Sequence, residues 1–262
     1  MFCNRLQFTM RKIAVTNQKG GSGKTTTAVN LGASLAFLQQ KVLLIDADPQ
    51  AHTTIHLGVN PYEVALTIYN VLTNAQPIDR AIVATHVARL DLLPSHINLS
   101  GAEIELVNAV GRESVLKDSL NGLNKAYDYL IIDCPPSLGL ITLNVLNAVT
   151  EVFIPIQTEF FALEGMSKLL ETVEIVKKRL NKSLQVTGVI LTMYDARKNI
   201  CKDVAKRVED YFKELVFATR IRENVRLAEA PSYGQPVILY APSSNGSKDY
   251  MELAKEVIAR GG

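Results

Sequence analysis

Short, strongly apolar segments alternate with longer amphipathic stretches through most of this 262-residue chain. The apolar segments predict buried strands at 12–16, 41–45, 90–94, 129–132, 151–156, 186–192 and 215–218. Helical spacing of apolar residues predicts helices at 25–39, 99–110, 113–123, 163–180, 199–212 and 248–260. Strands that are apolar on both faces and separated by helices imply a parallel sheet covered on both sides. We therefore expect an α/β fold with a doubly wound, mostly parallel sheet.

No linker rich in Pro, Gly or Ser interrupts this alternation, so we expect one domain over residues 11–262. Residues 1–10 precede the first predicted strand and are expected to form a short N-terminal extension. Apolar residues make up 47% of the chain, which is enough to build a sizeable core. No apolar run reaches the ~18 residues that a membrane span requires, so no membrane partner is expected.

The strongest chemical signal is a glycine-rich segment that joins the first predicted strand to the first predicted helix. It reads NQKGGSGKTT over residues 17–26. Glycines let successive backbone N–H groups turn toward phosphate oxygens, and a helix N-terminus adds its dipole. We expect Lys24 to neutralise the β- and γ-phosphates and the Thr25 hydroxyl to ligate Mg²⁺. The predicted nucleotide-binding residues here are Lys19, Gly20, Gly21, Ser22, Gly23, Lys24, Thr25 and Thr26.

This segment departs from the usual P-loop pattern at one end. Gln18 occupies the position of the first glycine, and it is followed by a second lysine, Lys19. The alternative interpretation is a plain glycine-rich turn between a strand and a helix. The Gly-Lys-Thr sequence at residues 23–25, placed between a strand and a helix, favours the phosphate-binding interpretation.

Carboxylates follow two of the other predicted strands. Asp46 and Asp48 come after the second strand, and Asp133 ends the strand at 129–132. Ligands of parallel sheets bind at the carboxyl ends of the strands, so these side chains are expected beside the P-loop. Asp133 fits the Walker B pattern, in which the carboxylate holds Mg²⁺ through water. Of Asp46 and Asp48, one is expected to order the loop while the other positions a water molecule.

The segments KGGSGKTT, DADPQ and IIDCPPSLG, in this order, resemble the ParA/Soj family of partitioning ATPases, within the ParA/MinD group with a deviant Walker A motif. The likeness continues at residues 101–106, 162–165, 192–197 and 224–232, and it covers roughly residues 11–259. The resemblance implies a P-loop NTPase fold. It also implies an enzyme that binds ATP with Mg²⁺ and hydrolyses it slowly to ADP and phosphate.

The resemblance also implies roles for single residues. Lys19 would reach the phosphates of the partner subunit in an ATP-sandwich homodimer, and Lys24 would bind phosphate in its own subunit. Asp48 would position the attacking water, so the implied catalytic set is Lys19, Lys24 and Asp48. The implied magnesium site consists of Thr25, Asp48 and Asp133.

Residues in the C-terminal third complete the implied site. Asn224 matches a residue near the adenine, whereas Arg197 and Arg226 match residues that bind double-stranded DNA without sequence preference. The expected partners are a second copy of the chain, DNA and a ParB-type centromere-binding protein. A cytoplasmic, nucleoid-associated location is expected for such a protein.

Three departures from the family pattern lie outside the P-loop. Ala51-His52 replaces Gly-Asn, residues 221–224 read Ile-Arg-Glu-Asn instead of Ile-Pro-Arg-Asn, and Tyr240-Ala241-Pro242 replaces Tyr-Asp-Pro. They bear on nucleotide affinity and on the rate of hydrolysis.

Charge is unevenly distributed along the chain. Residues 177–226 hold thirteen Lys and Arg against six Asp and Glu, although the whole chain has a net charge of only +2. On charge alone, a helix with a solvated, charged face is the favoured interpretation. The alternative is a polyanionic partner, which a local excess of this kind would suit.

The sequence bears on three alternative functions. A MinD-like positioning ATPase should end in a basic amphipathic helix, and residues 254–262 carry both charges and no large aromatic. An iron–sulfur carrier needs paired cysteines, whereas Cys134 and Cys201 are single and are expected in the core. A non-enzymatic binding module is disfavoured by the combination of Lys24 with Asp48.

Overall fold

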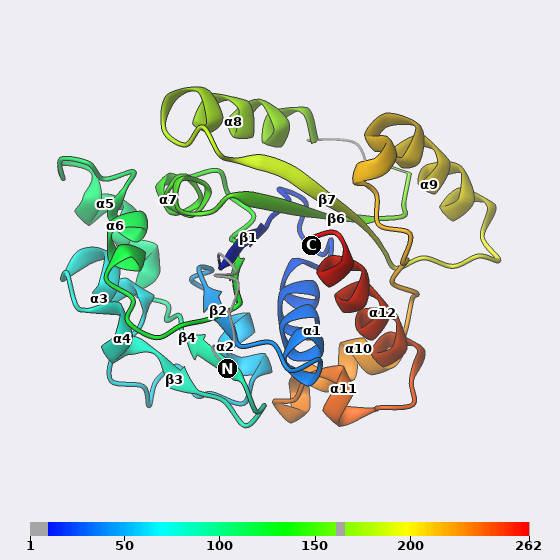
Figure 1. Cartoon of the computed structure of the whole chain (residues 1–262), viewed down its shortest axis with the longest axis horizontal. Helices are drawn as coiled ribbons and strands as arrows, with labels where there is room; N and C mark the ends of the chain where they lie inside the picture. Colours follow the sequence, from blue (N-terminus) through cyan, green and yellow to red (C-terminus); the bar gives the residue numbers. More distant parts are fainter. Residues whose placement is uncertain (1–9, 161–165, 262) are drawn as a thin grey trace, which may run out of the picture.

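The computed structural model describes residues 10–160 and 166–261, so nearly all of the predicted extension 1–10 lies outside the described residues. The described strands form a seven-stranded sheet in the order β3-β4-β2-β5-β1-β6-β7 (Figure 1). Their bounds are Arg11–Val15 (β1), Val42–Asp46 (β2), Val83–Ala84 (β3), Leu90–Leu93 (β4), Tyr129–Asp133 (β5), Glu151–Gln157 (β6) and Gln185–Thr192 (β7). Neighbouring strands pair in parallel, except that β3 runs antiparallel to β4.

Helices cover both faces of this sheet. They are α1 (Lys24–Phe37), α2 (His52–His56), α3 (Ile68–Thr73), α4 (Ile78–Ala81), α5 (Leu99–Leu106), α6 (Val115–Asn121), α7 (Leu140–Ala148), α8 (Met166–Arg179), α9 (Asn199–Phe212), α10 (Val225–Glu229), α11 (Val237–Tyr240) and α12 (Asn245–Ala259). One buried core contains residues of α3 to α9, and the other contains residues of α1, α11 and α12. The predicted doubly wound α/β fold is confirmed.

Apart from the edge strand β3, the strands are apolar on both faces because each of them contributes to both cores. In β1, Ala14 belongs to the core under α3 to α9, whereas Ile13 and Val15 belong to the core under α1 and α12. The three side chains are fully buried. Period-two alternation sends neighbouring residues to opposite faces, so a strand covered on both sides reads as one continuous apolar run.

The C-terminal helix α12 is part of the second core. Its residues Leu253, Ala254 and Val257 are buried, and α12 packs along α1 (Figure 1). The Tyr250 hydroxyl lies 3.1 Å from that of Thr27 on α1. The apolar face of this helix is therefore engaged in core packing. Among the helices described, none has the length and apolar character needed to cross a membrane.

The expectation of a strand at 215–218 is wrong. Residues Lys213–Leu215 form a 3-10 turn, and Val216 makes only an isolated parallel bridge to Val189 of β7. Phe217 instead packs edge-on against Phe153, with ring centroids 5.2 Å apart. An apolar run that covers the end of a sheet has the same composition as a short strand, so the sequence alone does not separate the two.

The strand β3 and the helices α2, α3, α4, α7, α10 and α11 were not predicted. The short edge strand β3 and the helix α7 both lack a clear apolar period. In α7 the buried positions include Asn144 and Asn147, whose amides donate to the carbonyls of Arg112 and Glu113 at 2.7 and 2.8 Å. Because buried polar side chains of α7 donate hydrogen bonds to carbonyls of a neighbouring loop, its buried positions are not all apolar, and the helical spacing of apolar residues is lost. The predicted helix at 163–180 begins within 161–165, outside the described residues, and is observed as α8 from Met166.

Candidate functional site

The site lies where β1, β2 and β5 end side by side. β1 pairs with β5 so that Val15 lies opposite Asp133, and β2 pairs with β5 so that Asp46 lies opposite Asp133. The segments that follow these parallel strands therefore meet at one edge of the sheet. This is the edge at which ligands bind in open α/β sheets.

The glycine-rich loop after β1 has the conformation of a phosphate cradle. Gly21 and Gly23 have φ of 73° and 88°, in the left-handed region that favours glycine. Nothing lies within 4 Å of the space that a side chain at Gly20 or Gly21 would fill. The loop is held from behind, because the Thr192 hydroxyl of β7 donates to the Ser22 carbonyl at 2.9 Å.

The two lysines of this loop lie in different surroundings. Lys24 is only 8% exposed, and its Nζ donates to the Lys19 carbonyl at 3.3 Å. Burial lowers the pKa of Lys24, and the nearby carboxylates of Asp133 and Asp48 oppose this shift. The Lys19 side chain is more exposed, and its Nζ lies 3.3 Å from Oε2 of Glu159, at the end of β6.

Asp133 is fully buried and only partly satisfied. Its Oδ2 accepts hydrogen bonds from the hydroxyls of Thr25 and Thr53 at 2.7 and 2.8 Å, whereas its Oδ1 is buried without a partner among the residues that the structure describes. Burial raises the pKa of Asp133 to about 6, and the two threonine hydrogen bonds oppose this shift. An orphaned carboxylate oxygen beside the P-loop threonine is suited to a water molecule on a bound cation.

Asp46 and Asp48 differ in their surroundings. The Oδ2 of buried Asp46 accepts from the Thr54 amide and hydroxyl at 2.8 and 2.7 Å, and its Oδ1 accepts from the Asp48 amide at 3.2 Å. Burial and the charge of Asp133 raise the pKa of Asp46 to about 8. Asp48 is half-buried and lines a cavity with Lys24. This geometry favours Asp46 for ordering the loop and Asp48 for positioning water.

Two adjoining cavities border the P-loop and together offer space for a nucleotide. The first, of about 430 Å³, is lined by P-loop residues together with Asp48, Gln50, His52, Pro136 and Met193. The second, of about 410 Å³, includes the apolar residues Ile221, Val225, Leu227 and Ala228 as well as Asn224. Both are bordered by Gly23, Thr26 and Met193. A cavity with a buried lysine beside a largely apolar one suits a phosphate chain in the first and a base in the second, which is the base cavity.

The residues present also fit a magnesium ion that binds together with phosphate. In the part of the chain that the structure describes, no group of three or more His, Cys, Asp or Glu is arranged to hold a metal by itself. Mg²⁺ is commonly bound through one or two protein oxygens while phosphates and water complete its coordination. The Thr25 hydroxyl and the orphaned oxygen of Asp133 are donors of this kind.

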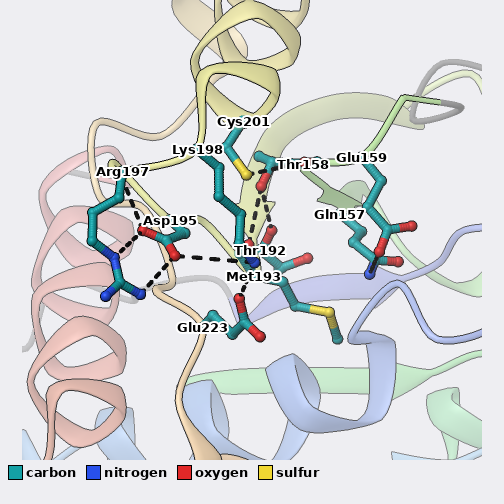
Figure 2. Close-up of polar contacts among 10 residues, drawn as sticks. All are labelled: Gln157, Thr158, Glu159, Thr192, Met193, Asp195, Arg197, Lys198, Cys201 and Glu223. Carbon is teal, nitrogen blue, oxygen red and sulfur yellow. Dashed lines mark hydrogen bonds and ion pairs between the residues drawn. The ribbon is translucent and has the colours of Figure 1, made fainter.

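The predicted residues of the C-terminal third lie beside the second cavity. Asn224 lines it, and its side chain also caps α10 by accepting from the Arg226 amide at 2.9 Å. Arg197 and Arg226 line neither of the two cavities and pair with carboxylates close in sequence. Arg197 binds both oxygens of Asp195 (Figure 2), and Arg226 Nη1 lies 2.7 Å from Glu229.

Several residues of the site were not predicted. Thr53 and Thr54 hold the two buried aspartates, and Met193, with φ of 51°, borders both cavities. The only signal for Thr53 and Thr54 is their place directly after the loop that carries Asp46 and Asp48. Ala51, the first residue of the departure from Gly-Asn, adopts φ of 54°. A non-glycine residue in this conformation costs about 1 kcal/mol, so the change from glycine strains the turn that leads into α2.

Lys24→Ala is expected to abolish nucleotide binding, because the buried cradle would lose its main cation while the phosphate charge stays the same. Titration of a fluorescent ATP analogue measures the affinity. Lys41→Ala is the matched control, since Lys41 is exposed at the opposite end of β2. Wild-type affinity in Lys24→Ala would show that the phosphates bind elsewhere.

Comparison with known proteins agrees with this geometry. A family model described as an AAA domain matches residues 10–186. The chain is 52% identical to the sporulation initiation inhibitor protein Soj of Bacillus subtilis, over 95% of this chain and 98% of that protein. It is 48% identical to the chromosome partitioning protein ParA of Myxococcus xanthus, over 95% of this chain and 88% of that protein.

A solved structure of cobyrinic acid a,c-diamide synthase from Mycobacterium smegmatis, with bound ADP and magnesium, superposes with a TM-score of 0.84 and 36% identity, over 95% of this chain and 94% of that chain. The full-length similarity to Soj and ParA and the geometry of the site point to the same family. The relevant features of the site are the phosphate cradle, the buried aspartates and the two cavities. The chain belongs to the ParA/Soj family of chromosome-partitioning proteins and is an ATPase that uses ATP and Mg²⁺.

Proposed function

We propose that this ATPase is a DNA-partitioning switch. ATP binding would bring two copies together face to face, each Lys19 crossing to the phosphates of the other subunit. The dimer would bind DNA without reading its sequence and would be found on the nucleoid. Hydrolysis, stimulated by a ParB-type centromere-binding protein, would open the dimer and release the DNA. We further propose that residues 11–262 act as one domain and that Asn224 lies against the adenine.

The position of Lys19 is the observation that carries this proposal. Its main chain is fixed, because its amide donates to Asn17 Oδ1 at 3.0 Å and its carbonyl accepts from Lys24. Its side chain instead extends to Glu159, and the two side chains are 30% and 58% exposed. An ion pair this exposed contributes only ~0–1 kcal/mol, so Lys19 can exchange Glu159 for a phosphate at little cost.

Hydrolysis follows from groups that the fold holds in place. The backbone on either side of the Asp48 carboxylate is held, because the Asp48 amide donates to Asp46 and the Gln50 amide donates to Asp48 at 2.9 Å. A carboxylate held in this way can orient a water molecule toward the terminal phosphate. Lys24 would stabilise the negative charge of the phosphates. Magnesium, held by Thr25 and Asp133 and placed near Asp48, would supply further neutralisation of that charge.

Arg197 and Arg226 are suited to contact DNA phosphates. The Arg197 side chain is 90% exposed, and the two arginines come from the loop after β7 and from α10. Neither lies on a long exposed helix that could enter a groove, so contacts to the backbone rather than to base edges are expected. Because α10 also lines the base cavity, the arginine and the nucleotide share one short segment.

Asp48→Ala should trap the ATP-bound dimer. Loss of a carboxylate that positions water typically lowers hydrolysis by ~10² or more, while Lys24 and Thr25 still bind the nucleotide. Phosphate release measures turnover, and light scattering measures the dimer. Asp46→Ala serves as the comparison, since it removes the acceptor of Thr54 and should mainly lower stability, by ~1–3 kcal/mol. Unchanged turnover in Asp48→Ala would contradict the assignment.

Arg197→Glu and Arg226→Glu should weaken ATP-dependent binding to all DNA sequences alike. Each lost phosphate contact should flatten the slope of log K against log salt by ~0.9, and dimerisation should persist. Filter binding over a salt series, with ATP and with ADP, gives both the affinity and the slope. Lys255→Glu is the control, because it makes the same change of charge at an exposed side chain of α12. If Arg197→Glu and Arg226→Glu bind DNA with the same affinity and slope as that control, the two arginines do not contact DNA and the basic segment is only a solvated surface.

A further inference from the structure

A third pocket, of about 440 Å³, lies beside the base cavity. Three cationic side chains line it, namely Arg197, Lys198 and Arg222. Arg222 and its neighbour Glu223 also line the base cavity, so the two spaces share a wall. Each of the three cations lies within 2.6–2.8 Å of a carboxylate. The pocket is therefore rich in positive groups that are neutralised from within the chain.

Two of these ion pairs are built into the fold. The carboxylate of Asp195 accepts from the amide, Nε and Nη2 of Arg197, and that of Asp249 accepts from the same three groups of Arg222. Both aspartate side chains are only 9% exposed. Removing the arginine from either would leave a largely buried charge without its partner, which is costly. These carboxylates are therefore not readily replaced by an incoming anion, and the 90% exposed Arg197 would contact a DNA phosphate while it stays paired with Asp195.

The third ion pair has a different character. Lys198 Nζ lies 2.7 Å from Glu223 Oε2, and these two side chains are 52% and 59% exposed. The same ammonium group lies at the longer distance of 4.0 Å from Asp195 Oδ2 (Figure 2). Among the described residues, Lys198 is the one hydrogen-bond donor that the Glu223 carboxylate has. An exposed pair of this kind contributes ~0–1 kcal/mol, so an anion from solution can displace the glutamate. Lys198 also directly follows Arg197, the arginine proposed to contact DNA.

We propose that Glu223 occupies Lys198 in the place of a DNA phosphate and thereby lowers the affinity of this protein for DNA. A carboxylate and a phosphodiester offer the same kind of anionic oxygen to an ammonium group. The negative charge of Glu223 also acts on Arg197, whose pKa is raised by hydrogen bonding to Asp195 and, to a smaller degree, by Glu223. The inference rests on the DNA-binding part of the proposed function and names Lys198 as a further phosphate-binding residue.

Glu223→Gln tests this directly, because it keeps the shape of the side chain and removes the charge. At saturating ATP, confirmed by titration for each variant, the Kd of the dimer for duplex DNA of unrelated sequences should fall by about 2- to 30-fold. This range corresponds to the loss of one exposed Lys198–Glu223 ion pair in each of the two subunits, at ~0–1 kcal/mol each, so that Glu223 no longer competes with DNA phosphate. The slope of log K against log salt should steepen by up to ~0.9 for each new phosphate contact.

Glu252→Gln is the matched control, since Glu252 also forms an exposed pair with a lysine, Lys255 on α12, outside this pocket. It removes the same charge and should change DNA binding little. In the double variant Lys198→Met with Glu223→Gln, most of the gain should disappear, because no ammonium group is left to release. Lys198→Met alone should weaken binding, since it leaves Glu223 unneutralised.

Each outcome decides a separate point. If Glu223→Gln binds DNA no more tightly than Glu252→Gln, the competition by Glu223 is refuted. If the gain persists in the double variant, it comes from net charge rather than from Lys198, and the inference is again refuted. If the wild-type protein binds no DNA with ATP, the proposed function itself fails, whatever the variants do.

Discussion

Two buried carboxylates at the ends of adjacent parallel strands organise this structure. Asp46 and Asp133 lie opposite each other in the register of β2 and β5, and both are fully buried. A buried carboxylate requires hydrogen-bond donors, and these come from Thr25 on α1 and from Thr53 and Thr54 on α2. The start of α1, the start of α2 and the ends of both strands are thereby held together around the phosphate cradle.

Buried and exposed polar contacts have different roles in the site. The buried contacts around Asp46 and Asp133 fix the segments that form the cradle, and rigid placement of this kind is the preorganisation that catalysis needs. At the rim, by contrast, Lys19 and Lys198 are held by glutamates in exposed ion pairs. Such pairs are weak, and a phosphate group can replace the carboxylate. The proposed binding and release of a partner subunit and DNA would require contacts that can be exchanged in this way.

Much of the site could be predicted from the sequence because its signals are local. The P-loop and the aspartates at the strand ends each occupy a few consecutive residues, and the parallel sheet brings them together. The contacts of Thr53 and Thr25 with Asp133 span 80 and 108 residues, and no local pattern marks them. The same holds for the partners of Lys19 and Lys198, Glu159 and Glu223, which are 140 and 25 residues away. Edge strand β3 and helix α7 escaped prediction because short or polar elements carry no apolar period.

We propose that Lys19 acts on the phosphates of a second subunit while Lys24 acts within its own. The most direct test is the molar mass in solution of Lys19→Ala, measured by light scattering with ATP, beside wild type and beside Asp48→Ala. The structure predicts that Lys19→Ala binds ATP with nearly wild-type affinity yet remains a monomer, whereas Asp48→Ala accumulates as a dimer. An ATP-dependent dimer of Lys19→Ala equal to that of wild type would contradict the account.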